Sequence, residues 1–163
     1  MKLSLCINTD DSNAVEGDPD KNFTAIEKVL EDELIKIYPD SKNFESAEIS
    51  LTFTDSDSIR QLNRDYRNID EPTDVLSFPM IEDIPVEIPE LPVLALGDIV
   101  ICPEEVRRLH PDLGDKESIC LMIAHSFLHL LGYDHDTQEK ESIMWQTQEL
   151  IANKMLAAIS GRH

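Results

Sequence analysis

Short stretches in which hydrophobic and polar residues alternate, or in which hydrophobic residues run together, predict four β-strands. The alternation is cleanest over residues 47–53, where every second side chain is apolar. The other three predicted strands lie at residues 2–7, 74–78 and 94–101. We expect Pro79 to end the strand at 74–78, because proline cannot donate to a strand ladder.

Hydrophobic residues recur at helical spacing in other segments, which predicts five helices. The first runs from about Phe23 and stops before Pro39; the others lie at about 56–66, from Pro103 onward, at about 116–131 and at about 137–159. Thr54 or Asp55 can cap the second helix with its side chain.

The helix at 116–131 is apolar nearly all round, and this predicts a central, buried helix. We expect Asp115 to cap its start and Gly132 to end it. Residues 8–20 and 80–93 are rich in acidic residues, glycine or proline and are predicted loops; the second is long enough to suggest a lid or binding loop. No linker or repeat divides the chain, so we expect one domain over residues 1–163.

Charge narrows the range of partners. The chain has 163 residues, of which 14 are Lys or Arg and 33 are Asp or Glu, giving a net charge of −19. This balance argues against a broadly basic nucleic-acid binder and against binding to anionic membranes. The longest apolar stretch contains Pro92 and Asp98, so no segment is expected to span a bilayer.

Cysteine use indicates a reducing compartment. Cys6, Cys102 and Cys120 are scattered, odd in number and form no Cys-x-x-Cys pair, so we expect three small buried residues and no disulfide. The N-terminal apolar stretch is too short for a signal peptide. The expected location is the cytoplasm.

Three of the five histidines lie within eleven residues and have the spacing of metal ligands. His125 and His129 are one helical turn apart and project from one face of the predicted helix. Gly132 then lets the backbone turn, so that His135 can approach the same ion. Three protein ligands leave a fourth position open, as in catalytic zinc sites. Buried, hydrogen-bonded core histidines are the alternative interpretation, and His110 and His163 are interpreted as surface residues.

The same spacing occurs in the metzincin metalloproteases, H-E-x-x-H-x-x-G-x-x-H. Ser126 stands at the position of their glutamate, which is the general base in those enzymes. The pattern therefore favours a metal hydrolase but argues against a peptidase of that type.

Arg60, Arg64 and Arg67 share one face of the second predicted helix. Guanidinium groups bind phosphate through a planar fork, so one interpretation is a phosphate-binding patch. The other is a solvated helix face paired with carboxylates such as Asp65 and Asp70. An Arg67 that faced the metal would favour the first interpretation.

Three blocks of sequence resemble the YbeY family of bacterial ribosomal RNA maturation factors. The blocks are residues 62–79 (with the segments LNRDYR and DEPTDVLSFP), 96–101 (LGDIVI) and 125–135 (HSFLHLLGYDH), in that order.

The resemblance implies an α+β, zincin-like domain with about four strands in a mixed sheet, flanking helices and a central metal-binding helix. It implies a metal-dependent endoribonuclease that acts on single-stranded RNA in 16S rRNA 3′-end maturation and ribosome quality control. His125, His129 and His135 would hold one zinc ion per chain, and Arg67 would be the other key active-site residue. The implied partners are ribosomal RNA, the small ribosomal subunit and an assembly GTPase; neither DNA nor a membrane is expected.

Two departures from the family pattern bear on function. Ser126 replaces a usual glycine, and its side chain could narrow the cleft or supply a hydrogen bond. The acidic chain repels RNA at long range, so binding must depend on a local patch or on a ribosomal partner.

Asp134 and Asp136 could orient the histidine rings or simply shape the turn. A non-enzymatic ribosome-assembly factor with a structural metal and a zinc-dependent peptidase are the alternative functions.

Overall fold

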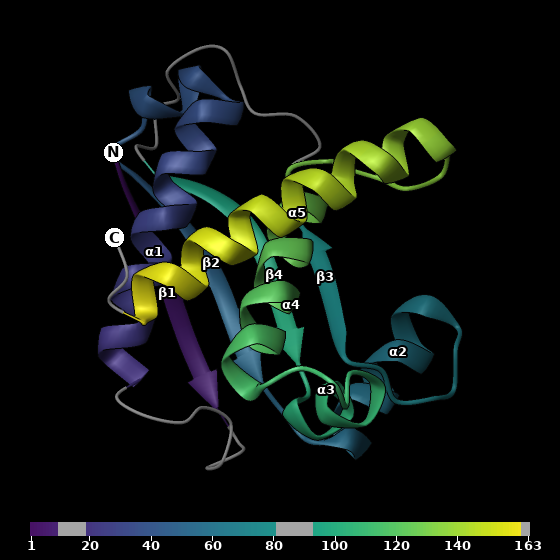
Figure 1. The fold of residues 1–163 in the computed structure, drawn as a ribbon. Coiled ribbons are helices and arrows are strands. Elements are labelled where there is room, and N and C mark those ends of the chain that lie inside the picture. The colour runs from purple at the N-terminus through teal and green to yellow at the C-terminus, as the bar shows by residue number, and fades with distance from the viewer. Residues whose placement is uncertain (10–18, 81–92, 161–163) are drawn as a thin grey trace.

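The structure, a computed structural model, describes residues 1–9, 19–80 and 93–160, with only the backbone described for residues 19–22. Its strands are β1 (Lys2–Thr9), β2 (Ser46–Phe53), β3 (Val75–Pro79) and β4 (Val93–Ile101). They form one sheet in the order β1-β2-β4-β3 (Figure 1). β1 with β2 and β2 with β4 are parallel, whereas β3 is antiparallel to β4. The predicted four-stranded mixed sheet is confirmed.

Within the described ranges, five α-helices accompany the sheet, as the hydrophobic pattern predicts. They are α1 (Pro19–Ile37), α2 (Ser56–Arg67), α3 (Pro103–Leu109), α4 (Asp115–Leu130) and α5 (Gln138–Ile159). A short 3-10 helix, η1 (Pro39–Asn43), follows α1 and has no counterpart among the predicted elements. None of the helices within the described residues has the length and apolar character needed to cross a bilayer. The two predicted loops fall largely on residues 10–18 and 81–92, outside the described residues.

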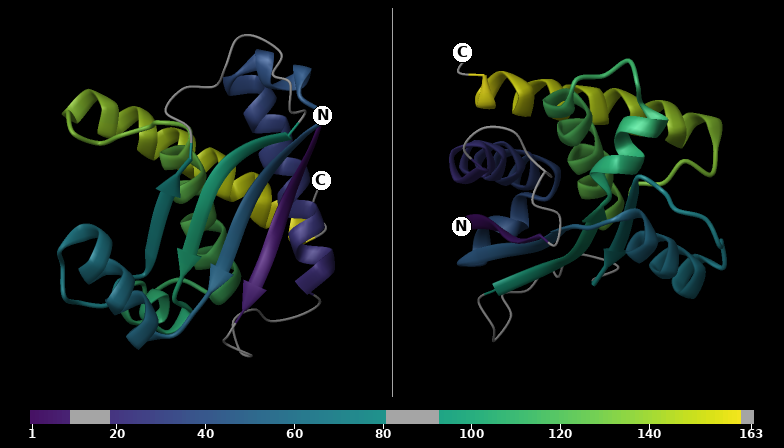
Figure 2. Two further views of the ribbon diagram at one scale, coloured as in Figure 1. Left: turned by 180° about the vertical axis from the view of Figure 1, so that it is seen from behind. Right: turned by 90° about the horizontal axis from the view of Figure 1, so that it is seen from below.

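Three helices, α1, α4 and α5, lie on one face of the sheet (Figure 2). α1 and α4 pack directly on the strands, and α5 crosses over both of them on the side away from the sheet (Figure 2). This arrangement explains the alternation in β2, whose apolar side chains are buried beneath the helices: Ala47, Ile49, Leu51 and Phe53. α2 and α3 lie near one end of the sheet, beside β3 and β4 (Figure 1).

α4 is the predicted central helix. It is buried on most sides because the sheet covers one of its faces and α5 covers another. Its N-cap is Gly114, so the expected cap Asp115 is wrong; Asp115 is instead the first helical residue. Gly132 follows the C-cap with a φ of 91° and ends the helix as predicted. At α2, Asp55 is the cap, and its Oδ1 accepts from the Ser58 amide at 2.7 Å.

Gly97 allows β3 and α4 to lie close to β4. Its φ is 144°, and a Cβ there would collide with the carbonyl oxygen of Phe78 and lie 2.8 Å from Cδ2 of Leu130. A side chain at this position would therefore push β3 and α4 away from β4. Without one, β3 is held against the helix that carries the paired histidines.

The expectation of three buried cysteines is correct for two of them. Cys102 and Cys120 are buried, and burial raises the pKa of the Cys120 thiol to about 12. Cys6 is exposed, so the prediction is wrong there. It lies on β1, an edge strand whose second half is exposed to solvent. All three thiols are free.

Candidate functional site

α4 holds two histidine rings against each other. His125 and His129 are half-buried, with ring centroids 4.5 Å apart and Nε2 atoms 3.1 Å apart. Each ring is fixed through its other nitrogen. Nδ1 of His125 lies 2.7 Å from Oε1 of Gln148, and Nδ1 of His129 lies 3.0 Å from the carbonyl oxygen of Tyr133.

These contacts determine which nitrogens are free. Both partners are acceptors, so each Nδ1–H donates, and the lone pairs of the two Nε2 atoms face each other. Two nitrogen ligands of one tetrahedral zinc ion are about 3.3–3.4 Å apart, close to the observed spacing. The paired rings therefore fit a shared cation, and the carbonyl and amide behind them are the partners that such ligands usually have.

Electrostatic effects also favour the neutral imidazole at His129. Burial lowers the pKa of His129, and the neighbouring His125 and His135 lower it further. Metal ions bind the neutral imidazole, so the lowered pKa favours the metal-binding form of His129.

His135 lies nearby but does not meet the other two rings. It is exposed on the turn after α4, with its ring centroid 5.5 Å from that of His129. Within the described part of the chain, no three His, Cys, Asp or Glu side chains come close enough to hold one ion. The structure thus brings together two of the three predicted ligands, His125 and His129. The third, His135, lies apart from them on the turn that follows α4.

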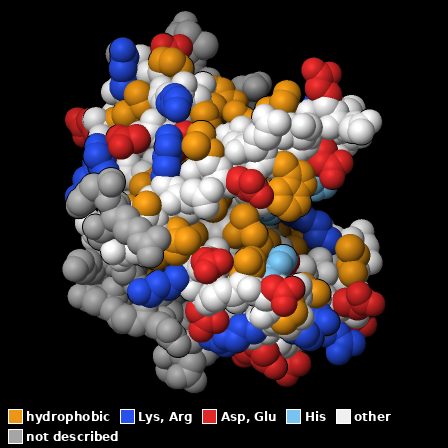
Figure 3. All heavy atoms as spheres, in the orientation of Figure 1, with side chains coloured by type: hydrophobic (Ala, Val, Ile, Leu, Met, Phe, Trp, Pro, Cys, Tyr) orange, Lys and Arg blue, Asp and Glu red, His pale blue; other side chains and the backbone are white. Residues whose placement is uncertain are grey.

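Arg67 shares a pocket with the paired histidines. This pocket of about 330 Å³ is lined by Arg67, His125, His129 and residues of β3. Nη2 of Arg67 donates to the carbonyl oxygen of Ser77 at 2.7 Å, and its guanidinium lies over the ring of Phe78, 5.1 Å from the centroid. The space-filling view shows the molecule hollowed between the projecting end of α5 and the lobe of α2 and α3, with histidines at the hollow (Figure 3).

The three arginines on one face of α2, the arginine stripe (Arg60, Arg64 and Arg67), do not all have the same surroundings. Nε of Arg60 lies 2.9 Å from Oδ1 of Asp70, and Nε of Arg64 lies 3.3 Å from Oδ1 of Asp65. These two arginines form a solvated, ion-paired face. Arg67 alone reaches the histidine pocket, because α2 ends there and its C-terminus lies against β3.

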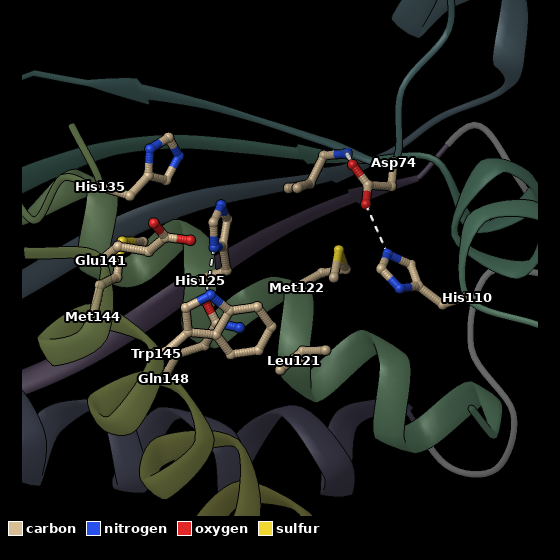
Figure 4. Close-up of a pocket in the computed structure, with 11 residues that line it drawn as sticks. Asp74, His110, Leu121, Met122, His125, His135, Glu141, Met144, Trp145 and Gln148 are labelled. Atoms are coloured by element: carbon tan, nitrogen blue, oxygen red, sulfur yellow. Dashed lines mark hydrogen bonds and ion pairs between the residues drawn. The ribbon is translucent and has the colours of Figure 1, made fainter. Parts of the chain in front are cut away.

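A second pocket of about 250 Å³ adjoins the first and has His125 and His135 in its wall (Figure 4). His110, expected at the surface, also lines it. This histidine is half-buried, and its Nε2 lies 2.9 Å from Oδ2 of Asp74. His163 lies outside the described residues.

The aspartates beside His135 serve the turn. Oδ1 of Asp134 accepts from the backbone amide of His135 at 2.7 Å, and Oδ1 of Asp136 lies 3.5 Å from Nζ of Lys140. The groups that orient the two paired rings are Gln148 and the Tyr133 carbonyl, neither of which the sequence analysis identified.

Ser126 takes neither of its two expected roles. Its side chain is fully buried and lines neither pocket, and its Oγ finds no hydrogen-bond partner within the described structure. An unsatisfied buried hydroxyl costs about 1–3 kcal/mol.

We expect Ser126→Ala to raise the free energy of unfolding by about 1 kcal/mol, measured by urea denaturation. Ser118→Ala is the matched control in the same helix. Ser118 is also buried, but its Oγ donates to the Asp115 carbonyl at 3.1 Å, so its loss is expected to destabilise. Equal destabilisation by the two substitutions would contradict this account of Ser126.

The fold and the paired histidines define a class. An α+β domain in which a mixed sheet is backed by a helix with two histidines one turn apart is zincin-like. The solution structure of TM1509 from Thermotoga maritima shares the fold, with a TM-score of 0.52 at 24% identity over 93% of this chain and 89% of that one.

Sequence comparison assigns the family. Residues 9–156 match the family described as Endoribonuclease YbeY. The protein of that name from Clostridioides difficile (strain 630) is 44% identical over 110 residues, which cover 66% of this chain and 71% of that protein. The one from Thermoanaerobacter sp. (strain X514) is 36% identical over 139 residues, 80% of this chain and 87% of that protein. The chain belongs to the YbeY endoribonuclease family.

Proposed function

We propose that this protein is a metal-dependent endoribonuclease that cleaves single-stranded RNA. The observation that carries the proposal is the shared pocket of Arg67, His125 and His129, in a chain of the YbeY endoribonuclease family. A phosphate-binding guanidinium beside a pair of free imidazole nitrogens suits hydrolysis of a phosphodiester bond.

One zinc ion per chain would be held by His125, His129 and His135. The fit of the first two rings supports this, and His135 follows on the adjacent turn and lines a pocket together with His125. Lewis-acid activation of a water molecule or of a phosphate oxygen is the chemistry that zinc would supply there.

Arg67 would stabilise the negative charge that develops on the phosphate. Within the described residues, its guanidinium donates to the carbonyl oxygens of Ser77 and Tyr66, at 2.7 and 3.4 Å, and these bonds use only part of its donors. The Ser77 contact and the ring of Phe78 hold the guanidinium at the pocket. A fixed guanidinium needs little reorganisation when charge develops.

The proposed setting is maturation of the 16S rRNA 3′ end and ribosome quality control in the cytoplasm. A chain of net charge −19 repels free RNA, and two of its three stripe arginines are already ion-paired. The resemblance implies the small ribosomal subunit and an assembly GTPase as partners, and docking to a ribosomal partner would present the RNA locally.

A zinc-dependent peptidase is the second candidate, since β3 is an edge strand beside the histidines and could pair with an extended peptide. Two features weigh against it. Arg67 already occupies the Ser77 carbonyl on that strand, and the residue after His125 is a buried serine, not a glutamate.

A substrate panel distinguishes the candidates. The purified chain, with zinc added, is incubated at low salt with a single-stranded fragment of the 16S rRNA 3′ end, the same fragment in a duplex, and casein. The proposal predicts cleavage of the single strand alone. Cleavage of casein without cleavage of RNA would contradict it, and a stable zinc complex with no turnover on free RNA or on small ribosomal subunits would favour the assembly factor.

Gln148 supplies a further prediction. Gln148→Leu removes the acceptor for His125 Nδ1–H and replaces it with an apolar side chain of similar size, so we expect zinc affinity to fall about 10–100-fold. Gln148→Glu keeps an acceptor and is expected to retain affinity. Competition with a fluorescent zinc chelator measures both variants, and wild-type affinity in Gln148→Leu would contradict a positioning role.

A further inference from the structure

The second pocket combines an aromatic surface with hydrogen-bond acceptors. It lies between α4, α5 and the start of β3. Figure 4 shows the indole of Trp145 near the ring of His125, and the pair of Asp74 and His110 at the other end of the pocket. The lining residues that matter are Trp145, Glu141, Met122, Leu121 and Asp74.

Trp145 is unusual for its exposure. Its side chain is half-exposed, at 51%, although it is the largest apolar side chain in the protein and the only tryptophan. Its neighbour Met144 is almost fully buried, so α5 has a core-facing side that Trp145 does not join. An indole left at the mouth of a pocket offers a flat surface on which a planar ring can stack.

The charges of the two pockets indicate that the phosphate of a bound RNA would not enter the second pocket. Its two acidic side chains, Asp74 and Glu141, repel phosphate, whereas the adjoining pocket holds Arg67. Val75 and His125 line both pockets, so the two pockets are neighbours. A base attached to a phosphate near Arg67 could therefore turn toward the pocket of Trp145.

We propose that this pocket binds one unstacked nucleobase, stacked on Trp145 and preferably bearing an exocyclic amino group. The inference rests on the proposed RNA substrate and assigns a base-binding subsite to it. Single-stranded RNA is recognised through splayed bases that stack on aromatic side chains. The Glu141 carboxylate accepts hydrogen bonds from amino groups but repels carbonyl oxygens, which favours cytosine over uracil, a base of the same size. Asp74 is bonded to His110 and contributes mainly its charge.

Because Trp145 is the only tryptophan, its fluorescence reports on this pocket directly. The full chain, kept in chelator to prevent turnover, is titrated with short oligocytidylate and oligouridylate. We expect oligocytidylate to quench the emission with an affinity about fivefold or more above that of oligouridylate. Oligoarginine is the third probe, since a cationic side chain could also stack on an indole between carboxylates.

Substitutions test the two parts of the subsite. Trp145→Leu is expected to weaken binding of fluorescein-labelled oligocytidylate about tenfold by anisotropy. Leu150→Ala is the matched control on the same helix, because Leu150 is 48% exposed and does not line this pocket. Glu141→Gln is expected to reduce the preference for cytosine, whereas Glu139→Gln, on the same turn but outside the pocket, is expected to keep it.

Three results would overturn the proposal: no quenching by either oligonucleotide, quenching by oligoarginine alone, or wild-type binding by Trp145→Leu. Equal affinity for the two oligonucleotides would overturn the amino-group preference. None of these readouts requires cleavage. Quenching without any nuclease activity would therefore refute the proposed function and leave the subsite standing, whereas cleavage with no effect at Trp145 would do the reverse.

Discussion

Replacement of His129 by alanine is expected to lower cleavage of single-stranded RNA by about 10³-fold or more, because it removes one of the two nitrogens that face each other on α4. The loss of cleavage activity should parallel the loss of bound zinc. The measurement is the rate of RNA cleavage together with zinc content per chain, determined on the same sample.

A folding check accompanies this variant, since His129 also bonds to the Tyr133 carbonyl. The circular dichroism spectrum is expected to match that of the wild-type chain without zinc. A folded His129→Ala protein that cleaves RNA at the wild-type rate would show that the paired histidines are not the reactive centre.

Replacement of Arg67 by alanine is expected to lower the rate about 10²–10³-fold while zinc content stays unchanged. The reason is that Arg67 lines the histidine pocket but is not a metal ligand. Arg67→Lys keeps the charge without the planar fork, so we expect it to recover only part of the activity. Cleavage rates at saturating RNA and zinc content per chain are the measurements.

The neighbouring arginines are matched controls for Arg67. Arg60 and Arg64 lie on the same helix, are exposed and pair with Asp70 and Asp65. Their alanine variants are expected to keep near-wild-type rates. Equal losses in all three variants would point to general attraction of RNA by the stripe and contradict a specific role for Arg67.

The main elements were predictable because their sequence patterns reflect burial directly. The alternation over residues 47–53 corresponds to a strand that one layer of helices covers. The all-round apolar α4 lies between the sheet and α5, as its composition requires. Helical periodicity was also sufficient to place His125 and His129 on one face.

Long-range contacts account for what the sequence did not predict. Asp74 and His110 are 36 residues apart and meet only because β3 and the end of α3 converge at the second pocket. Likewise, spacing could not tell which stripe arginine reaches the histidines, because that depends on how α2 docks against β3.

Gln148 left a weak signal that could have been found. It interrupts an apolar stripe on α5 formed by Met144, Ile151 and Met155, all of them buried. A polar side chain in such a stripe needs a hydrogen-bond partner. The partner proves to be a ring nitrogen of His125, on another helix.

If zinc on the paired histidines drives RNA cleavage, a zinc titration shows this most directly. The chain is stripped with chelator, zinc is restored in steps, and cleavage of single-stranded RNA and bound zinc are measured at each step. The account predicts activity that rises in proportion to bound zinc and saturates at one ion per chain. Full activity in the zinc-free protein, or activity unrelated to bound zinc, would contradict it.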